Sequence, residues 1–316
     1  MMRKRIISVA ALAVSASLLF SGCAGGSGDA DAAAGGSAGD SELGLPIGEE
    51  PSTEANPELT ALLPEEIQES GVLKMGSEFP YPPMADLNED NRAVGYDPEL
   101  VRALAQKLGV EAEIIKQPFS TAIPGLQAGK IDVYMGGMTD TPERQETLSF
   151  VNYLFGGFKT VAMKGNPEGL STLDDLCGLN VAVGASTVQG DILRSHDCGD
   201  TPVNVVEYPT DADVHTAVRA GRAVAFVTDG FVAEWLAENT NDGEVFEVVR
   251  DPEAPAGFSP VYAGIGILKE DEQLVEALQA ALQELIEEGT YQEILDRNGL
   301  SDFAVESAEI NQGKAL

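Results

Sequence analysis

The stretch Gly129–Gln145, GKIDVYMGGMTDTPERQ, predicts a buried strand, a glycine loop and a helix start in direct succession. Ile131–Met135 is a short apolar run of the kind that forms a buried strand. Gly136–Gly137 follow it, and glycine allows backbone N–H groups to come close to a ligand. Thr141–Glu143 then supply a hydroxyl N-cap, a proline at the first helical position and an acid in the first turn.

Arg144 is thereby placed beside a helix N-terminus at the carboxyl end of a strand. A guanidinium group, free amides and the positive end of a helix dipole all attract anions, so the stretch predicts a carboxylate site. The alternative is an ordinary helix surface, on which Arg144 pairs with Glu143 or Glu146.

The composition is that of an acidic globular protein. The chain has 316 residues, of which 43% are hydrophobic, enough for two domains or one large one. Lys and Arg number 19 against 52 Asp and Glu, giving a net charge of −33. Such a chain repels nucleic-acid phosphates and anionic lipid, so we expect neither as a partner.

The first 22 residues have the pattern of a signal peptide: the basic Arg3–Arg5, the apolar run Ile6–Phe20 and a small-residue site. The apolar run, about 15 residues, is short for a membrane span. Phe20–Cys23 resembles a bacterial lipobox, with Phe20 replacing the usual Leu. The resemblance implies cleavage before Cys23 and lipidation of Cys23, with palmitate among the acyl groups, on the extracytoplasmic face of the membrane. The alternative is an ordinary secreted protein.

Two further cysteines, Cys177 and Cys198, are separated by roughly 20 residues. An exported chain meets an oxidising compartment, so we expect these cysteines to form a disulfide bond; two free thiols are the alternative. Only His196 lies near them and no CxxC spacing occurs, so we expect no metal site.

The remaining chain divides into a tether and a folded part. Residues 23–58 are rich in Gly, Ala, Ser, Asp and Glu and predict a flexible acidic tether. From about Leu59 onward, strand-like and helix-like segments alternate, which indicates an α/β fold with mainly parallel sheets flanked by helices. The long helix predicted over Glu272–Glu288 carries an apolar stripe and is ended by Gly289.

The chain from about Leu63 to Leu300 resembles the family 3 extracellular solute-binding proteins, the polar amino-acid receptors of ABC importers. The resemblance rests on short landmarks that occur in the family's order and at its spacing, among them Gly71–Lys74, Tyr81–Pro83, Val94–Asp97, Ile123–Asp132, Thr139–Arg144, Leu176–Gly178, Thr228–Asp229 and Gly289–Leu295.

The resemblance implies a type II periplasmic-binding-protein fold, with two lobes joined by two crossover strands near Leu154–Phe158 and Val261–Gly264. Lobe 1 would comprise residues 59–156 plus 264–316, and lobe 2 residues 157–263. It further implies a monomer without a cofactor, which delivers its amino acid to an ABC permease and the ATPase of that permease.

Ligands of open α/β sheets bind beyond the carboxyl ends of the strands. Applied to the expected strands, this rule gathers acids, hydroxyls, aromatics and one cation at one site: Glu78, Tyr81, Phe119, Gly137, Thr139, Arg144, Ser186, Thr187 and Asp229. A zwitterion needs donors for its carboxylate and an acceptor for its ammonium group, and this set provides both.

The resemblance assigns roles to these residues. Arg144 would bind the ligand α-carboxylate with help from Thr187, and Asp229 would accept the α-ammonium with help from Thr139 and the Gly137 carbonyl. Tyr81 and Phe119 would sandwich the ligand's carbon chain, and Glu78 would reach its side-chain end.

Simpler alternatives remain open for each residue. Asp229 could cap the following helix, Tyr81 and Phe119 could be core aromatics, Thr139 could brace its loop, and Glu78 could be a solvated acid at the rim.

Two departures from the family pattern bear on the ligand. The usual Gly-Thr-Thr loop of lobe 2 is Ala185–Thr187 here, which keeps the hydroxyl. Asp140 replaces a common Ile or Val and adds negative charge. Together with Glu78, Asp140 favours a cationic or polar side chain, such as that of Arg, Lys, His or Gln.

Two other function classes compete with the receptor. A secreted enzyme on the same fold, resembling the dehydratases of this family, would need catalytic groups. The only histidines, His196 and His215, are expected away from strand ends, and no Gly-x-Ser-x-Gly or His-Glu-x-x-His motif occurs. A ligand-sensing module is the third reading; no later membrane span or effector segment accompanies it. We therefore expect a binding protein and no enzyme.

Overall fold

The computed structural model describes residues 49–315. The expected signal peptide, Cys23 and the tether up to residue 48 lie outside the described residues. Within 49–315, no helix is both long and apolar enough to cross a bilayer.

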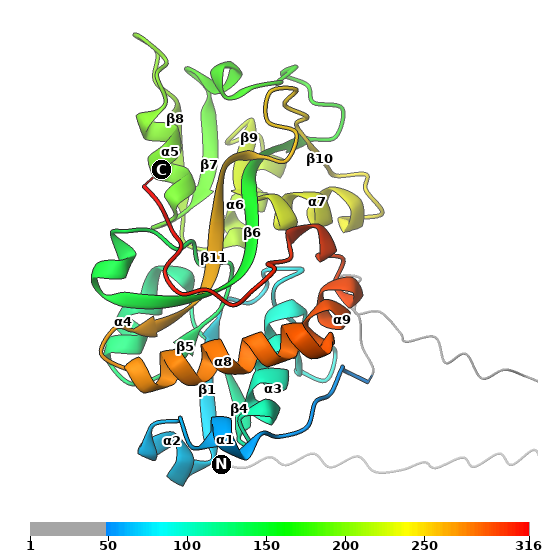
Figure 1. Cartoon of the computed structure of the whole chain (residues 1–316). Coiled ribbons are helices and arrows are strands. Elements are labelled where there is room, and N and C mark those ends of the chain that lie inside the picture. Colours follow the sequence, from blue (N-terminus) through cyan, green and yellow to red (C-terminus); the bar gives the residue numbers. More distant parts are fainter. Residues whose placement is uncertain (1–48, 316) are drawn as a thin grey trace, which may run out of the picture. The chain divides into compact units, whose positions relative to one another are not determined.

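One sheet connects two groups of strands, in the order β4-β1-β5-β11-β6-β9-β7-β8, with β10 beside β6 (Figure 1). We call the β4-β1-β5 group, with its helices, lobe 1, and the β9-β7-β8 group lobe 2. The strands are β1 (Val72–Ser77), β4 (Glu111–Lys116), β5 (Val133–Tyr134), β6 (Leu148–Met163), β7 (Asn180–Gly184), β8 (Asn204–Tyr208), β9 (Ala225–Asp229), β10 (Phe246–Val248), β11 (Phe258–Leu268) and the separate hairpin β2 (Asp86–Leu87) and β3 (Ala93–Val94).

Helices pack against both groups of strands, as expected for an α/β fold. Lobe 1 has α1 (Pro57–Thr60), α2 (Glu65–Ser70), α3 (Tyr96–Lys107), α4 (Ala122–Gln127), α8 (Glu272–Glu288) and α9 (Thr290–Arg297). Lobe 2 has α5 (Val188–Ser195), α6 (Asp211–Arg219) and α7 (Gly230–Asn239). The final helices therefore lie beside the first ones, and α8 contacts both α1 and α3.

The strand directions bring the carboxyl ends of the two groups toward each other. β5 is antiparallel to β11, β11 to β6, and β6 to β9. Three antiparallel steps leave β5 and β9 running in opposite directions, and both groups are parallel internally. Since β6 leads from lobe 1 into lobe 2, β1 and β5 point toward lobe 2, and β7, β8 and β9 point toward lobe 1 (Figure 1).

The apolar stripe of α8 is buried as its spacing predicts. Leu274, Leu278, Leu282 and Leu285 are all at most 2% exposed. Gly289 follows in the left-handed conformation with φ of 91°, which ends the helix at low cost. Replacing one of these leucines with alanine should cost about 2–5 kcal/mol of stability, so the stripe fixes α8 on lobe 1.

One expectation around the opening stretch needs correction. The predicted helix at Thr141 is only a single 3₁₀ turn, η2 (Arg144–Glu146), because β6 already begins at Leu148. β6 itself is a strand of 16 residues. Its first half is buried on both faces, so it shows no alternation from which a strand could be recognised.

The last part of the expected tether, 49–58, lies against lobe 1 instead of being free. Glu50 forms ion pairs with Arg92 and Arg102, at 2.7 and 2.8 Å. The Thr53 hydroxyl donates to Glu288 at 2.6 Å, and α1 begins at Pro57. Residues 49–58 are therefore part of the folded lobe and do not belong to a free tether.

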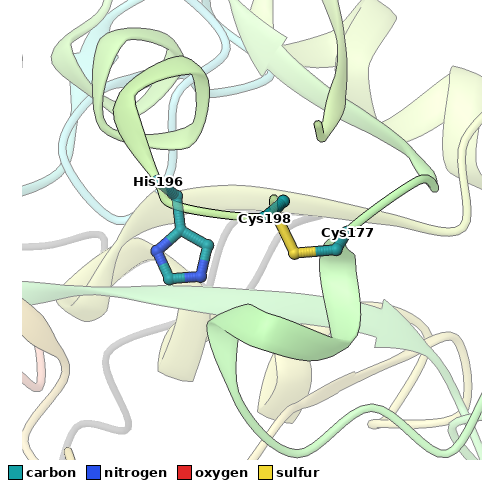
Figure 2. Close-up of side chains that lie close together, drawn as sticks. All are labelled: Cys177, His196 and Cys198. Carbon is teal, nitrogen blue, oxygen red and sulfur yellow. A yellow bond between two sulfur atoms is a disulfide. The ribbon is translucent and has the colours of Figure 1, made fainter. Parts of the chain in front are cut away.

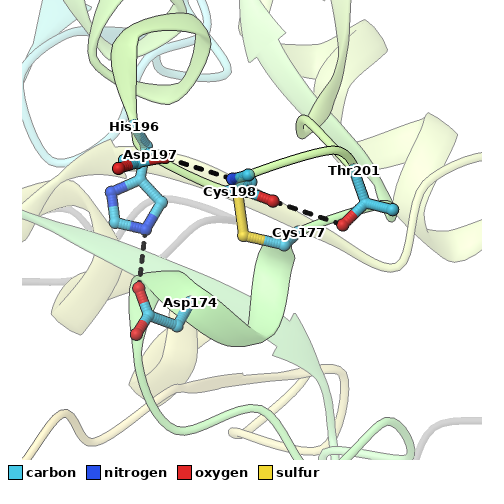
Figure 3. Close-up of a disulfide and its surroundings, with 7 residues drawn as sticks. Asp174, Cys177, His196, Asp197, Cys198 and Thr201 are labelled. Atoms are coloured by element: carbon cyan, nitrogen blue, oxygen red, sulfur yellow. Dashed lines mark hydrogen bonds and ion pairs between the residues drawn. A yellow bond between two sulfur atoms is a disulfide. The ribbon is translucent and has the colours of Figure 1, made fainter.

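The disulfide bond expected between Cys177 and Cys198 is present, with a Cα–Cα distance of 5.5 Å (Figure 2). It joins the end of the 3₁₀ helix η3 (Leu173–Leu176) to the loop after α5. His196 lies beside it and its Nε2 is 2.8 Å from Asp174 (Figure 3). The His196 nitrogen and the two sulfurs lie within 4.8 Å of one another, but sulfurs in a disulfide bond are not the thiolates that bind metals.

Replacing both Cys177 and Cys198 with serine should lower the free energy of unfolding by about 3 kcal/mol, because the bond closes a loop of sequence separation 21 in the unfolded chain. Urea denaturation of the two proteins measures the difference. A reductant should destabilise the wild type to a similar extent and leave the variant unchanged. Identical midpoints for wild type and variant would contradict this prediction.

Candidate functional site

A cleft between the facing strand ends collects almost all of the predicted site residues. Eight of the nine line it: Glu78, Tyr81, Phe119, Gly137, Thr139, Arg144, Thr187 and Asp229. The ninth, Ser186, is exposed and contributes its backbone carbonyl to Arg144 instead. Further lining residues, outside the predicted set of nine, are Tyr134, Gly136, Gly184, Ala185, Gln189, Pro209, Thr210, Asp211, Val214, Val227 and Thr228.

Arg144 reaches across the cleft and keeps its charge unpaired. Its Nη1 donates to the Thr139 carbonyl at 2.8 Å and its Nη2 to the Ser186 carbonyl of lobe 2 at 3.1 Å. Its guanidinium carbon lies 5.3 Å from the centre of the Phe119 ring. Among the described residues no carboxylate forms an ion pair with Arg144, so neither Glu143 nor Glu146 takes the role left open above.

The chemistry at Arg144 is that of an anion site. Burial lowers the pKa of the guanidinium, and the charge of Asp229 opposes that effect. Arginine remains protonated in proteins, so Arg144 is a half-buried cation that donates to two neutral carbonyls and forms no ion pair in the described part of the chain. Because η2 is a single 3₁₀ turn, the attraction for a carboxylate comes from the guanidinium group and not from a helix dipole.

Asp229 faces Arg144 from lobe 2. Its Oδ2 accepts a hydrogen bond of 2.7 Å from the Tyr81 hydroxyl of lobe 1. Asp229 holds the N-cap position of α7 but makes no side-chain capping bond, so the capping alternative is not realised. Burial raises its pKa to about 6, although the Tyr81 hydrogen bond and the charge of Arg144 both favour the ionised form.

Glu78 joins the two lobes and is not a solvated rim acid, since it is only 8% exposed. One oxygen accepts the backbone N–H of Phe119 in lobe 1 at 2.9 Å, and the other accepts that of Asp211 in lobe 2 at 3.2 Å. Asp211 is the first residue of α6, so the Glu78 carboxylate lies at that helix's N-terminus.

Asp211 is the most important residue that the sequence reasoning missed. It follows β8, and the rule that selected residues after the other strands could have selected it. Burial raises its pKa well above the ordinary value, and the negative charges of Glu78 and Asp229 act in the same direction. His215, one turn further along α6, has Nε2 3.0 Å from Oδ2 of Asp211. His215 was expected away from strand ends, and the α-helical spacing of four residues brings it beside the cleft.

Two buried side chains, Tyr153 and Asp97, fix the glycine loop after β5 by hydrogen bonds. The N–H of Gly137 donates to the Tyr153 hydroxyl at 3.2 Å, and this hydroxyl donates to Asp97 at 3.0 Å. Gly137 has φ of 65°, and a Cβ there would lie 3.1 Å from the Phe231 ring, so the position suits glycine on both counts. The Gly137 N–H is thus already hydrogen-bonded to Tyr153, and the Gly137 carbonyl is the backbone group that could bind a ligand.

Asp140 does not line the cleft, so the expectation that its charge favours a cationic or polar ligand is wrong. It is fully buried, and its carboxylate accepts from Gln145 at 2.6 Å, from Asn152 at 3.1 Å and from the backbone N–H of Gly313 at 2.8 Å. Its charge therefore fixes the C-terminal segment against β6, and the argument for a cationic ligand rests on Glu78 together with Asp211.

Comparison with known proteins supports a solute-binding role for this cleft. The sequence pattern of the bacterial extracellular solute-binding proteins, family 3, matches residues 73–300. The arginine-binding protein ArgT of Corynebacterium glutamicum is 35% identical over 265 residues, covering 81% of this chain and 83% of ArgT. The L-cystine-binding protein TcyJ of Escherichia coli is 30% identical over 232 residues, covering 73% of this chain and 84% of TcyJ.

The solved structures agree with the fold. The crystal structure of the P235GK mutant of ArgBP from T. maritima superimposes with a TM-score of 0.67 at 30% identity, covering 74% of this chain and 98% of that one. The type II periplasmic-binding-protein fold is thus confirmed, and the proteins compared are binding proteins for different amino acids.

Replacing Tyr81 with phenylalanine should move the pKa of Asp229 upward from about 6, because the lost hydroxyl stabilises the ionised carboxylate. Carboxyl-carbon NMR titration of the free protein measures the shift. Tyr262→Phe, which removes a hydroxyl from a tyrosine packed on Phe155, is the matched control and should leave the titration unchanged. An unchanged pKa in the Tyr81 variant would show that the hydrogen bond is absent in solution.

Proposed function

Because the chain belongs to the bacterial extracellular solute-binding proteins of family 3, we propose that its cleft binds a polar amino acid with a cationic side chain and delivers it to an ABC permease. Arginine is the first candidate. The proposal also makes the protein a monomeric receptor on the extracytoplasmic face of the membrane, anchored through a lipid on Cys23.

The observation that carries the proposal is the pairing of opposite charges across the cleft. Arg144 offers a half-buried cation with no ion-paired carboxylate among the described residues, and Asp229 offers a buried carboxylate from the other lobe. An α-amino acid carries the complementary charges on neighbouring atoms. Its carboxylate would replace the carbonyls now bound by Arg144, and its ammonium group would donate to Asp229.

The remaining charges favour a cationic side chain. Glu78 and Asp211 lie next to each other in the cleft wall, and within residues 49–315 no second Lys or Arg lines the cleft. A zwitterion with a neutral side chain would leave both acids without a positive partner. A guanidinium or ammonium group on the side chain supplies one, which agrees with the arginine-binding relatives.

The contacts between the lobes explain how binding would be signalled. Three side-chain bonds cross the cleft: Arg144 to the Ser186 carbonyl, Tyr81 to Asp229, and the Asp211 N–H to Glu78. All of them use groups that would contact the ligand. A ligand that bonds to both lobes favours the closed arrangement by its differential affinity, and the permease would recognise that arrangement.

Titration calorimetry with the twenty amino acids tests the function. We expect arginine to bind most tightly and lysine next, with glutamine weaker by about tenfold or more because it leaves the acids unpaired. A folded protein that binds none of them would overturn the amino-acid proposal. Turnover of a bound amino acid, followed by mass spectrometry, would support the enzyme alternative instead.

Arg144→Ala should abolish binding of every amino acid while changing the melting temperature of the free protein little, because the side chain makes no ion pair. Arg144→Lys keeps the charge but loses the two-pronged donor geometry and should bind with intermediate affinity. Arg250→Ala is the matched control, since its side chain is 70% exposed and pairs with Glu234. Undiminished binding by Arg144→Ala would refute the carboxylate assignment.

Cys23→Ser should release the full-length protein from membranes of its native host and abolish incorporation of labelled palmitate. The reason is that the residue supplies the sulfur for the proposed lipid. Membrane fractionation and labelling measure both effects, with Cys177→Ser as a control that removes a different cysteine. Membrane retention of the Cys23 variant would contradict the proposed anchor.

A further inference from the structure

We propose that Asp211 selects ligands by side-chain charge and that binding a cationic side chain releases the proton held on its carboxyl group. A neutral side chain of the same shape would bind with that proton retained. The inference rests on the proposed function and concerns the same cleft. It adds a residue that determines specificity and a proton whose release depends on whether the ligand side chain is charged.

The geometry of Asp211 supports this role. It lies at the start of α6 in lobe 2, lines the cleft and has a side chain that is 14% exposed. Its backbone N–H is bound to Glu78 of lobe 1. The Glu78 carboxylate is therefore held against the first turn of α6, where its charge acts on the Asp211 carboxyl group.

The groups around Asp211 leave its charge uncompensated. Glu78 from lobe 1 and Asp229 from β9 are the charges that act on it, and both are negative. The Tyr81 hydroxyl faces the same acids, and its pKa is raised by burial first and then by the charges of Asp229 and Asp211. On its own helix, Asp211 faces His215, and the charge of Arg219 acts on that histidine.

His215 does not supply the missing positive charge. Burial and the charge of Arg219 lower its pKa to about 4, so the ring is neutral at pH 7. Its Nε2 lies 3.0 Å from Asp211, but the two are not aligned as a hydrogen bond, and Nε2 is a buried atom without a partner in the described part of the chain. A neutral imidazole beside a carboxyl group tolerates the protonated acid, which a histidinium would not.

The sign of the proton exchange follows from these charges. Without a cation nearby, the raised pKa of Asp211 means that the acid holds its proton to a higher pH than a solvated aspartate. A guanidinium group placed against it favours the carboxylate and lowers the pKa, so the proton passes to the buffer. The affinity for a cationic ligand should therefore increase with pH up to the pKa of the free protein's Asp211 and then level off.

The test compares L-arginine with L-citrulline, in which a neutral urea group replaces the guanidinium group. Calorimetry of the full folded chain in buffers of different ionisation enthalpy, between pH 5 and pH 8, counts the protons released. Both ligands carry the same α-ammonium group, so any proton from Asp229 cancels in the difference. We expect arginine to release more protons than citrulline, with the excess falling to zero as the pH rises.

The variant Asp211→Asn identifies the source of the proton. It should remove the excess proton release and reduce the preference for arginine over citrulline by about tenfold or more, while citrulline still binds. Asp213→Asn is the matched control, because Asp213 is an exposed acid on the same helix and should change neither quantity.

Each result decides the inference separately from the proposed function. Equal proton release for arginine and citrulline in the wild type would overturn it, and this measurement needs no variant to fold. Excess release that persists in Asp211→Asn would assign the proton to another group and would also overturn it. Binding of neither ligand nor of any other amino acid would instead refute the proposed function.

Discussion

The site depends on the opposed directions of the two strand groups. Three antiparallel steps across β11 and β6 turn the carboxyl ends of β1 and β5 toward those of β7, β8 and β9. Open α/β sheets bind ligands at those ends, so two half-sites are created that face each other. Neither half alone holds both charges of a zwitterion, because Arg144 belongs to one and Asp229 to the other.

That division explains why the cleft groups bond to one another across the lobes. Buried polar groups need hydrogen-bond partners. In this structure the Tyr81 hydroxyl donates to Asp229, Arg144 donates to the Ser186 carbonyl, and the Asp211 N–H donates to Glu78. Each of these bonds joins the lobes, and under the proposed function each would be exchanged for a bond to the ligand. Closure and binding would then use the same few donors and acceptors, which would link them thermodynamically.

The sequence predicted the fold class, most strands and eight of the residues that line the cleft, because strand ends can be read from short apolar runs. It failed where tertiary packing decides. The helix expected at Thr141 is cut to one turn by the early start of β6, and β6 itself lacks alternation since both faces are buried. Asp211 was missed although it follows β8, since its position beside Glu78 depends on how the two lobes face each other. Lobe boundaries and ligand roles remain predictions.

Asp140 shows how a residue can depart from a family pattern without touching the ligand. Its carboxylate binds Asn152 of β6 and the N–H of Gly313, and the C-terminal segment, red in Figure 1, crosses β6 where Ile310 bridges Val151. A Cβ at Gly313 would lie 2.1 Å from the backbone carbonyl oxygen of residue 140, so this close approach requires glycine at position 313. An apolar residue at 140 would leave these donors unsatisfied. The Asp140 carboxylate thus attaches the C-terminal segment to β6. The preference of the cleft for a charged side chain therefore depends on Glu78 and Asp211.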